Sequence, residues 1–251
     1  MYFDTHCHLN SEQLYEKRAD YVRHAMDCGV DHMVVVGYNL KASELAVAIS
    51  QEFENVYAAV GIGPEDCLDT DAEELAKLEA LLTKPKVVAL GEIGLDYHWD
   101  TVPPQKQKAI FRAQLELAKK YQQIVVIHCR DAMQDTYEIL AGAGVKGIMH
   151  CYSESVEMAQ RFIKLGFKIS LAGPVTFKNA RIPKEVAAKL DLKDLLIETD
   201  APYLAPTPLR GKINEPANVV YTASEIARLR GVSVEEVARQ TTENAMKVFR
   251  I

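Results

Sequence analysis

The chain has few cysteines and no long hydrophobic run, and both shortages exclude classes of protein. Five of its 251 residues are cysteine and show no paired spacing, so we expect no disulfide framework and take a reducing, cytoplasmic compartment as the default. No apolar run approaches 18 residues, so no membrane span is expected. The first residues show no basic segment followed by an apolar core, so no presequence is expected either.

Basic residues are also scarce. Lys and Arg number 29 against 35 Asp and Glu, which gives a net charge of −6. Proteins that coat nucleic acid broadly carry a basic face, so this balance argues against such a role. It is still compatible with local binding of one phosphate where metal ions supply the positive charge. Nothing in the sequence indicates an obligate protein partner.

Eight short apolar runs alternate with helical patterns along the chain. Most runs are continuous and β-branched, which is typical of parallel strands buried on both faces. They occupy residues 2–6, 32–38, 56–62, 87–93, 124–129, 147–151, 167–171 and 195–200. Eight such units predict an α/β fold, a TIM-type (β/α)8 barrel with an extra C-terminal helix. With no Ser/Gly linker, we expect one domain over residues 1–251.

An open, doubly wound sheet is the competing architecture. That fold normally places a Gly-rich dinucleotide turn after an early strand, whereas here the first strand is followed by HCHLN. Helical spacing of Phe111, Leu115, Ala118 and Tyr121 predicts one covering helix, and Ser233 with Glu236 predicts an N-terminal capping box. The Pro-rich stretch 201–216 is expected to be an ordered surface loop.

Six polar residues are expected at the carboxyl ends of these strands, where barrels carry their active sites. They are His6, His8, Glu92, His128, His150 and Asp200. Because side chains alternate along a strand, His6 and His8 point the same way and Cys7 points to the opposite face. All five cysteines are therefore interpreted as packing residues. Asp4 shares the face of the two histidines and is expected to orient them from deeper in the fold.

Four imidazoles and two carboxylates are too many polar groups to bury at one edge without a partner. Two divalent ions would satisfy them. We expect His6, His8 and Asp200 on one ion, His128 and His150 on the other, and Glu92 between the two. Such a pair lowers the pKa of a bridging water and leaves a local charge of about +2, which suits a phosphodiester. A lone H-x-H is weak evidence and would by itself favour a structural role.

Other charged residues follow the same strands. Arg130 and Arg210 are candidates for substrate binding, and His98 either contacts substrate or lies on the rim without a role. Solvated surface charge is the expected role of Lys178, Arg181 and Lys212. His24 and His32 are expected to be structural or exposed.

Seven blocks of the sequence resemble the TatD family of metal-dependent hydrolases in the expected order. They are FDTHCHL, GEIGLDYH, VIHCRDA, HCYSES, ETDAPYLAP, RGKINEP and TTENAMKVF. The resemblance implies a TIM-like barrel with one or two metal ions, Mg, Mn or Zn, held by the six residues above. It implies Asp200 as general base, Glu92 as a further catalytic carboxylate, and hydrolysis of ester bonds in DNA.

The sequence departs from the family after the third strand. Where the family commonly shows a GIHPH-like block, this chain has GIGPED, so that Gly63 and Glu65 stand in place of two histidines. Glu154 also departs from a common HCFSG-like block. Three hypotheses therefore stay open: a deoxyribonuclease, a metal-dependent hydrolase of a small ester, lactone or amide, and a barrel that binds without catalysis.

Overall fold

The computed structural model describes residues 1–251 and contains eight strands and nine α-helices. The strands are β1 (Tyr2–Cys7), β2 (Val30–Val36), β3 (Val56–Val60), β4 (Val87–Asp96), β5 (Ile124–Arg130), β6 (Gly147–Met149), β7 (Phe167–Leu171) and β8 (Leu195–Ile197). The helices are α1 (Arg18–Asp27), α2 (Leu40–Glu52), α3 (Ala72–Leu81), α4 (Pro104–Tyr121), α5 (Met133–Ala143), α6 (Val156–Lys164), α7 (Arg181–Lys189), α8 (Val219–Arg230) and α9 (Val234–Phe249). None of these helices is both long and apolar enough to cross a membrane.

The strands form one sheet in the order of the chain, from β1 to β8. Neighbouring strands pair in parallel, as in β4 with β5 and β7 with β8, and a parallel bridge joins Cys7 to Ala201 beyond β8. Helices alternate with the strands, and α9 follows α8 as an additional helix. The predicted class, a TIM-type (β/α)8 barrel with an extra C-terminal helix, is confirmed.

The chain divides into two compact units, which we describe separately. Unit 1 comprises residues 1–34, 151–164 and 168–251, and unit 2 comprises residues 35–150 and 165–167. The expectation of one domain over residues 1–251 therefore stays a prediction.

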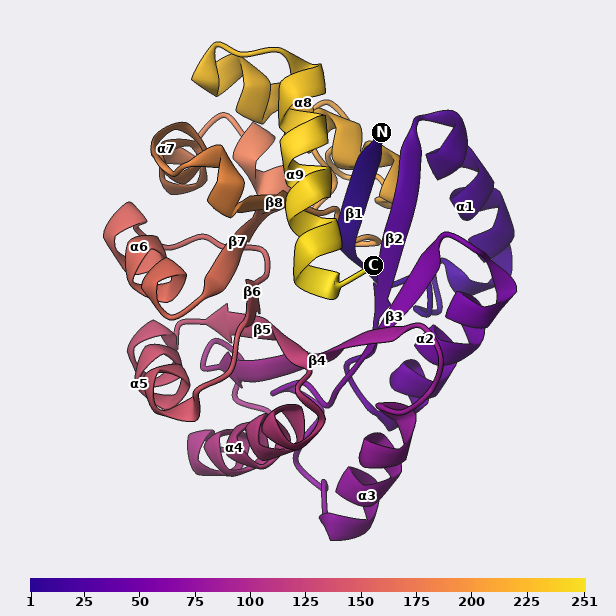
Figure 1. The fold of residues 1–251 in the computed structure, drawn as a ribbon, viewed down its shortest axis with the longest axis vertical. Helices are drawn as coiled ribbons and strands as arrows, with labels where there is room; N and C mark the ends of the chain where they lie inside the picture. The colour runs from indigo at the N-terminus through magenta and orange to yellow at the C-terminus, as the bar shows by residue number, and fades with distance from the viewer. The chain divides into compact units, whose positions relative to one another are not determined.

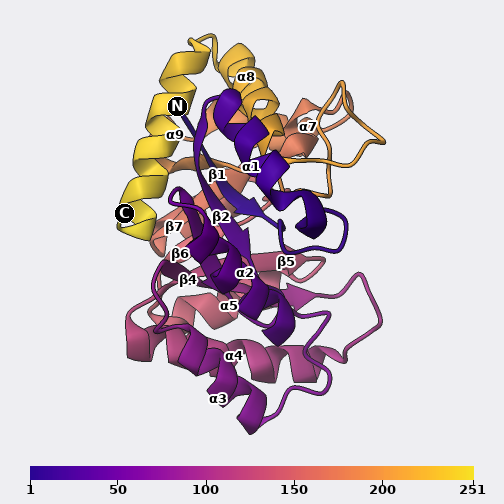
Figure 2. The ribbon, with the colours of Figure 1, turned by 90° about the vertical axis from the view of Figure 1, so that its right-hand side faces the viewer.

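In unit 1, α9 packs along β1, and α8 packs against α9 (Figures 1 and 2). Phe3 of β1 is fully buried and stacks on Phe249, with ring centroids 5.6 Å apart. At the N-terminus of α9, Glu236 N donates to Ser233 Oγ at 3.1 Å, which is the serine half of the predicted capping box. This helix thus holds the strand that carries His6.

In unit 2, α4 covers β4 through buried apolar residues and two buried amides. Phe111 and Leu115 are buried, as the helical spacing predicts. Gln114 accepts from Ile62 N and donates to Ile62 O, both at 2.9 Å. Gln107 accepts from Asp96 N at 2.9 Å and donates to Asp96 O at 2.7 Å. The helix thereby fixes the backbone at the carboxyl end of β4.

Of the eight predicted strand ends only that of β7 is correct: β1, β4 and β5 run further, and β2, β3, β6 and β8 end earlier. His150 and Asp200 therefore lie just beyond β6 and β8 rather than at their last residues. Strand β4 continues to Asp96, and its register against β5 shifts between Leu90 and Ile93, so Glu92 lies at an irregularity inside the strand. Irregularities of this kind change the direction in which a side chain points. His128 also lies inside its strand, since β5 extends to Arg130. In β4 and β5 the predicted ends were too early because polar residues interrupted the apolar pattern before the hydrogen-bond ladder ended.

Candidate metal centre

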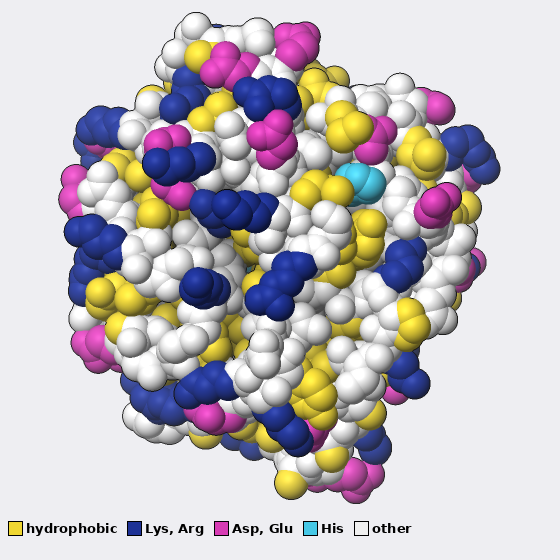
Figure 3. Space-filling model, in the orientation of Figure 1, with side chains coloured by type: hydrophobic (Ala, Val, Ile, Leu, Met, Phe, Trp, Pro, Cys, Tyr) yellow, Lys and Arg dark blue, Asp and Glu magenta, His cyan; other side chains and the backbone are white.

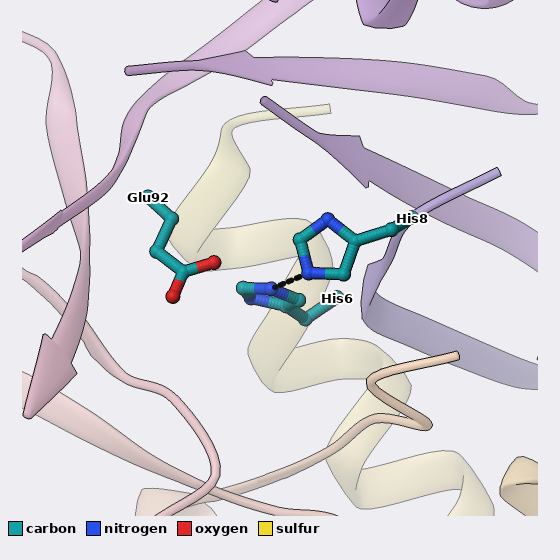
Figure 4. Close-up of side chains that lie close together, drawn as sticks. All are labelled: His6, His8 and Glu92. Carbon is teal, nitrogen blue, oxygen red and sulfur yellow. Dashed lines mark hydrogen bonds between the residues drawn. The ribbon is translucent and has the colours of Figure 1, made fainter. Parts of the chain in front are cut away.

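In unit 1, the two histidines of the opening block face each other. Figure 4 shows both rings and the hydrogen bond between them, with Nε2 of His6 lying 3.1 Å from Nε2 of His8. His6 is fully buried and His8 is buried. Cys7 between them points elsewhere, with its thiol 3.5 Å from Val34 O, so the predicted alternation is confirmed.

Asp200 joins this pair although it is distant in the sequence. Its Oδ1 lies 3.4 Å from Nε2 of His8 and 3.7 Å from Nε2 of His6. Two backbone hydrogen bonds hold the segments together, from Asp200 N to His6 O at 2.9 Å and from His8 N to Ala201 O at 2.7 Å. His6, His8 and Asp200 therefore form one set of converging donors within unit 1.

Asp4 contacts the backbone that carries Asp200. Its carboxylate accepts from Thr199 N at 2.8 Å, from Thr199 Oγ1 at 2.6 Å and from His6 N at 3.3 Å. Burial raises the pKa of Asp4 to about 8, against the lowering effect of the Thr199 hydrogen bonds. These contacts give Asp4 a positioning role toward the 199–200 segment.

Unit 2 contains a second set of converging donors. Oε1 of Glu92 lies 2.8 Å from Nδ1 of His128 and 3.3 Å from Nε2 of His150. The two histidine nitrogens are 3.3 Å apart. Glu92 and His150 are buried, and the side chain of His128 is 19% exposed.

Asp96 was not anticipated, yet it is the partner of the other His128 nitrogen. Its Oδ2 lies 2.8 Å from Nε2 of His128, and Asp96 is 1% exposed. Burial lowers the pKa of His128, but hydrogen bonds to Asp96 and Glu92 outweigh it and raise the pKa to about 9. Burial raises the pKa of Asp96, but its contacts with His128 prevail and lower it. The sequence signal was its even spacing from Glu92 in GEIGLD, but the shift in register next to Glu92 makes that spacing an unreliable guide to the strand face.

Glu198 is a second carboxylate that the sequence analysis missed. It is fully buried, and its Oε1 accepts from Cys151 N at 2.5 Å. Its position two residues before Asp200 could have suggested it, because residues two apart share a face of an extended segment.

Both donor sets fit a divalent transition-metal ion. Ligand atoms about 2.0–2.1 Å from a tetrahedral ion lie roughly 3.3 Å from one another. Donor separations within each set are close to that value, from 3.1 to 3.7 Å in unit 1 and from 2.8 to 3.3 Å in unit 2. Glu92, His128 and His150 form a group able to hold an ion. Imidazole and carboxylate donors suit Zn, Mn and Fe, and carboxylates also suit Mg.

The predicted substrate-binding residues lie at the surface. The guanidinium carbon of Arg130 is 5.5 Å from the ring centroid of Trp99, and that of Arg210 is 4.2 Å from the ring centroid of Phe177. His98 Nδ1 lies 3.2 Å from an Asp131 carboxylate oxygen. The remaining lysines and arginine expected to be solvated are exposed, namely Lys178, Arg181 and Lys212.

The histidines expected to be structural or exposed lie away from the donor sets. His24 is exposed on α1, and its Nδ1 lies 2.9 Å from a Glu215 carboxylate oxygen. His32 lies in β2, where its ring is 5.3 Å from that of Phe3.

The amino-acid sequence matches a family model over almost its whole length. A family model described as TatD related DNase matches residues 3–250. The chain belongs to the TatD family. The resemblance drawn from the seven sequence blocks is thereby confirmed.

Named relatives agree with this TatD assignment. The chain is 46% identical over 254 residues to the uncharacterized metal-dependent hydrolase YabD of Bacillus subtilis, with 100% of both chains covered. It is 38% identical to the uncharacterized metal-dependent hydrolase YcfH of Escherichia coli K12, covering 99% of this chain and 95% of the relative. The crystal structure of YJJV, a TatD homologue from Escherichia coli K12, superposes with a TM-score of 0.95 at 29% identity, covering 100% of this chain and 98% of the other. The chain is a metal-dependent hydrolase of the TatD family.

Proposed function

We propose that this TatD-family hydrolase is a deoxyribonuclease that cleaves phosphodiester bonds with divalent metal ions, of which we expect two. The observation that carries the proposal is the pair of donor sets, each made of two imidazoles and one carboxylate at ion-coordinating separations. In this proposal the metal ligands are the six residues predicted from the sequence: His6, His8, Glu92, His128, His150 and Asp200.

Divalent ions bound there would supply Lewis acidity and lower the pKa of a bound water. The chain supplies the proton acceptor. Oδ1 of Asp200 lies within 3.7 Å of both imidazole nitrogens in unit 1, which suits a general base beside the attacking water. The water oxygen bonds to phosphorus while Asp200 accepts its proton. The ester P–O bond breaks with its electron pair on the leaving oxygen, which takes up the proton held by Asp200 and departs as an alcohol. Glu92 is the further catalytic carboxylate, because its Oε1 lies beside both imidazole nitrogens of unit 2 and would share their ion.

Arg130 and Arg210 are the proposed phosphate contacts. Both are exposed, and each guanidinium lies over an aromatic ring. On the face drawn in Figure 3, Lys and Arg side chains are scattered and separated by uncharged or acidic ones. The net charge of −6 favours local contacts to a few phosphates over a long basic track.

The test is cleavage of DNA by the purified protein with Mg²⁺, Mn²⁺ or Zn²⁺ added separately. We expect cleavage with at least one of these ions and loss of cleavage in His128→Ala. Lys178→Ala, which removes an exposed charge outside both donor sets, serves as the matched control and is expected to retain activity. DNA left intact under every metal, by protein shown to contain metal, would contradict the nuclease assignment.

One observation favours a second candidate, a metal-dependent hydrolase of a small ester, lactone or amide. Carboxylate oxygens of Glu65 and Asp96 lie with a His128 nitrogen in a cluster whose atoms are within 4.8 Å of one another. A carboxylate at residue 65 repels an anionic phosphodiester. Activity on uncharged esters or amides without activity on nucleic acid would select this candidate, and Glu65→Gln should then leave that activity unchanged.

A further inference from the structure

The only tryptophan of the chain lies at the surface of unit 2. Trp99 is 48% exposed, although indole rings usually bury most of their large apolar area. It follows β4 by three residues. An exposed aromatic ring beside a candidate catalytic site is a reason to look for a ligand that stacks on it.

Asp96 connects this ring to the donor set of unit 2. One of its carboxylate oxygens, Oδ2, lies 2.8 Å from Nε2 of His128. The other, Oδ1, accepts from His98 N at 2.9 Å and from Trp99 N at 3.3 Å. A single buried carboxylate therefore contacts both the imidazole and the backbone of Trp99, so the backbone that carries the indole is tied to His128.

A positive charge lies beside the indole. Arg130 follows His128 by two residues on β5, and its guanidinium carbon is 5.5 Å from the Trp99 ring centroid. The backbone also joins the two segments, because Tyr97 N donates to Arg130 O at 2.9 Å. The His98 ring meets Trp99 edge to face, with centroids 4.8 Å apart. The ring thus contacts Arg130 and His98 while the residue as a whole stays 48% exposed.

We propose that Trp99, flanked by Arg130, is a stacking platform for an unpaired base of single-stranded nucleic acid. The inference rests on the proposed nuclease function and specifies its substrate. An indole stacks on any base because every base has a π face, and the adjacent guanidinium suits the phosphate next to a stacked base. Bases inside a duplex are already stacked on one another, so the platform favours single strands over duplex.

The single tryptophan makes the test direct, since all indole fluorescence of the protein comes from Trp99. Metal-loaded full-length protein is titrated with a phosphorothioate oligothymidylate of about eight nucleotides, a length within the range bound by stacking proteins. Saturable quenching is expected. An abasic strand of the same length keeps the backbone charges and is expected to bind more weakly and to quench little.

Variants separate stacking from charge. Trp99→Ala should weaken binding of a dye-labelled oligothymidylate by about 5- to 140-fold in fluorescence anisotropy, and Trp99→Phe should retain part of the affinity. Tyr221→Ala removes another exposed aromatic ring, on α8, and should change nothing. Arg130→Gln should weaken the intact and the abasic strands alike.

The outcomes distinguish this inference from the function on which it rests. Oligonucleotide cleavage without quenching, or equal affinities of the wild type and Trp99→Ala, would overturn the platform and leave the nuclease in place. Quenching by an abasic strand equal to that by oligothymidylate would also overturn it. Absence of phosphodiester cleavage with every metal would instead overturn the proposed function itself.

Discussion

Oδ2 of Asp96 lies 2.8 Å from Nε2 of His128, and this contact decides which imidazole nitrogen is available to a ligand. A ring that donates its Nε2 hydrogen to Asp96 presents Nδ1 as the electron-pair donor. Nδ1 is the atom that lies 2.8 Å from Glu92 and 3.3 Å from His150. Carboxylates placed behind metal-binding histidines fix the tautomer in this way and make the ring a better ligand.

We expect Asp96→Asn to weaken metal binding by the donor set of unit 2 by about 10- to 100-fold, the range found when such outer carboxylates are removed. The amide cannot supply the negative charge that favours Nδ1 as ligand. Competition with a chelating dye measures the change. Asp100→Asn removes an exposed charge four residues away and should bind metal as the wild type does. Equal affinities of Asp96→Asn and the wild type would remove Asp96 from this role.

Metal binding by unit 2 should strengthen with pH. Hydrogen bonds to Asp96 and Glu92 outweigh burial and raise the pKa of His128 to about 9, so its imidazole is protonated at neutral pH without metal. An ion must displace that proton, so affinity should rise roughly tenfold per pH unit and level off above pH 9. Calorimetry in two buffers of different ionisation enthalpy should detect about one proton released per ion near pH 7. A pH-independent affinity would contradict this expectation.

The sequence predicted the fold class because eight apolar runs with helical patterns between them leave few architectures. It also identified the pairing of His6 and His8, since strand alternation is a local property. Asp96 escaped notice because its role depends on the register between β4 and β5, which shifts next to Glu92. No pattern within one strand encodes that shift.

Trp99 was overlooked for a different reason. A single aromatic residue in a loop has no periodicity from which a role could be predicted. Only its contacts with Arg130 and with the Asp96 carboxylate indicate a binding role. Asp4 was predicted to lie on the histidine face, and that placement stays a prediction. Its partner, Thr199, lies 195 residues away along the chain, a separation at which sequence patterns give no information.

Asp4 should make the metal-free protein less stable as pH rises. Burial raises the pKa of its carboxyl to about 8 from an ordinary 3.8, so the folded state binds a proton that the unfolded state has lost between these values. Its contribution to stability is complete below pH 3.8 and is lost as pH rises through 8. Asp4→Asn keeps a neutral group of the same shape and should therefore gain stability relative to the wild type at the upper end of this range.

Urea unfolding of chelator-treated protein at about pH 5 and about pH 8 measures this difference. Asp4→Ala is the informative companion, because it leaves Thr199 N and Oγ1 without their acceptor and should cost about 1–3 kcal/mol for each unsatisfied group. Asp69→Asn removes the charge of an exposed carboxylate and should not alter the pH dependence of the unfolding free energy. If the unfolding free energy of Asp4→Asn depends on pH as that of the wild type does, a group other than Asp4 causes the dependence.

Gly94→Ala should damage the fold and the donor set of unit 2 together. Gly94 pairs with His128 across β4 and β5, and its φ is +149°, a conformation that side chains rarely adopt. A Cβ built there would lie 1.9 Å from His128 O, so β5 would have to move at the residue whose ring is positioned for metal. We expect a loss of about 3 kcal/mol in unfolding free energy and weaker metal binding.

Gly142→Ala is the matched control, because Gly142 lies in α5 with nothing within 4 Å of its added Cβ. This variant should gain about 0.5–1 kcal/mol in unfolding free energy. Urea unfolding and metal titration of both variants provide the test. A Gly94→Ala protein as stable as the wild type would contradict the prediction, because β5 would then move at His128 without loss of unfolding free energy.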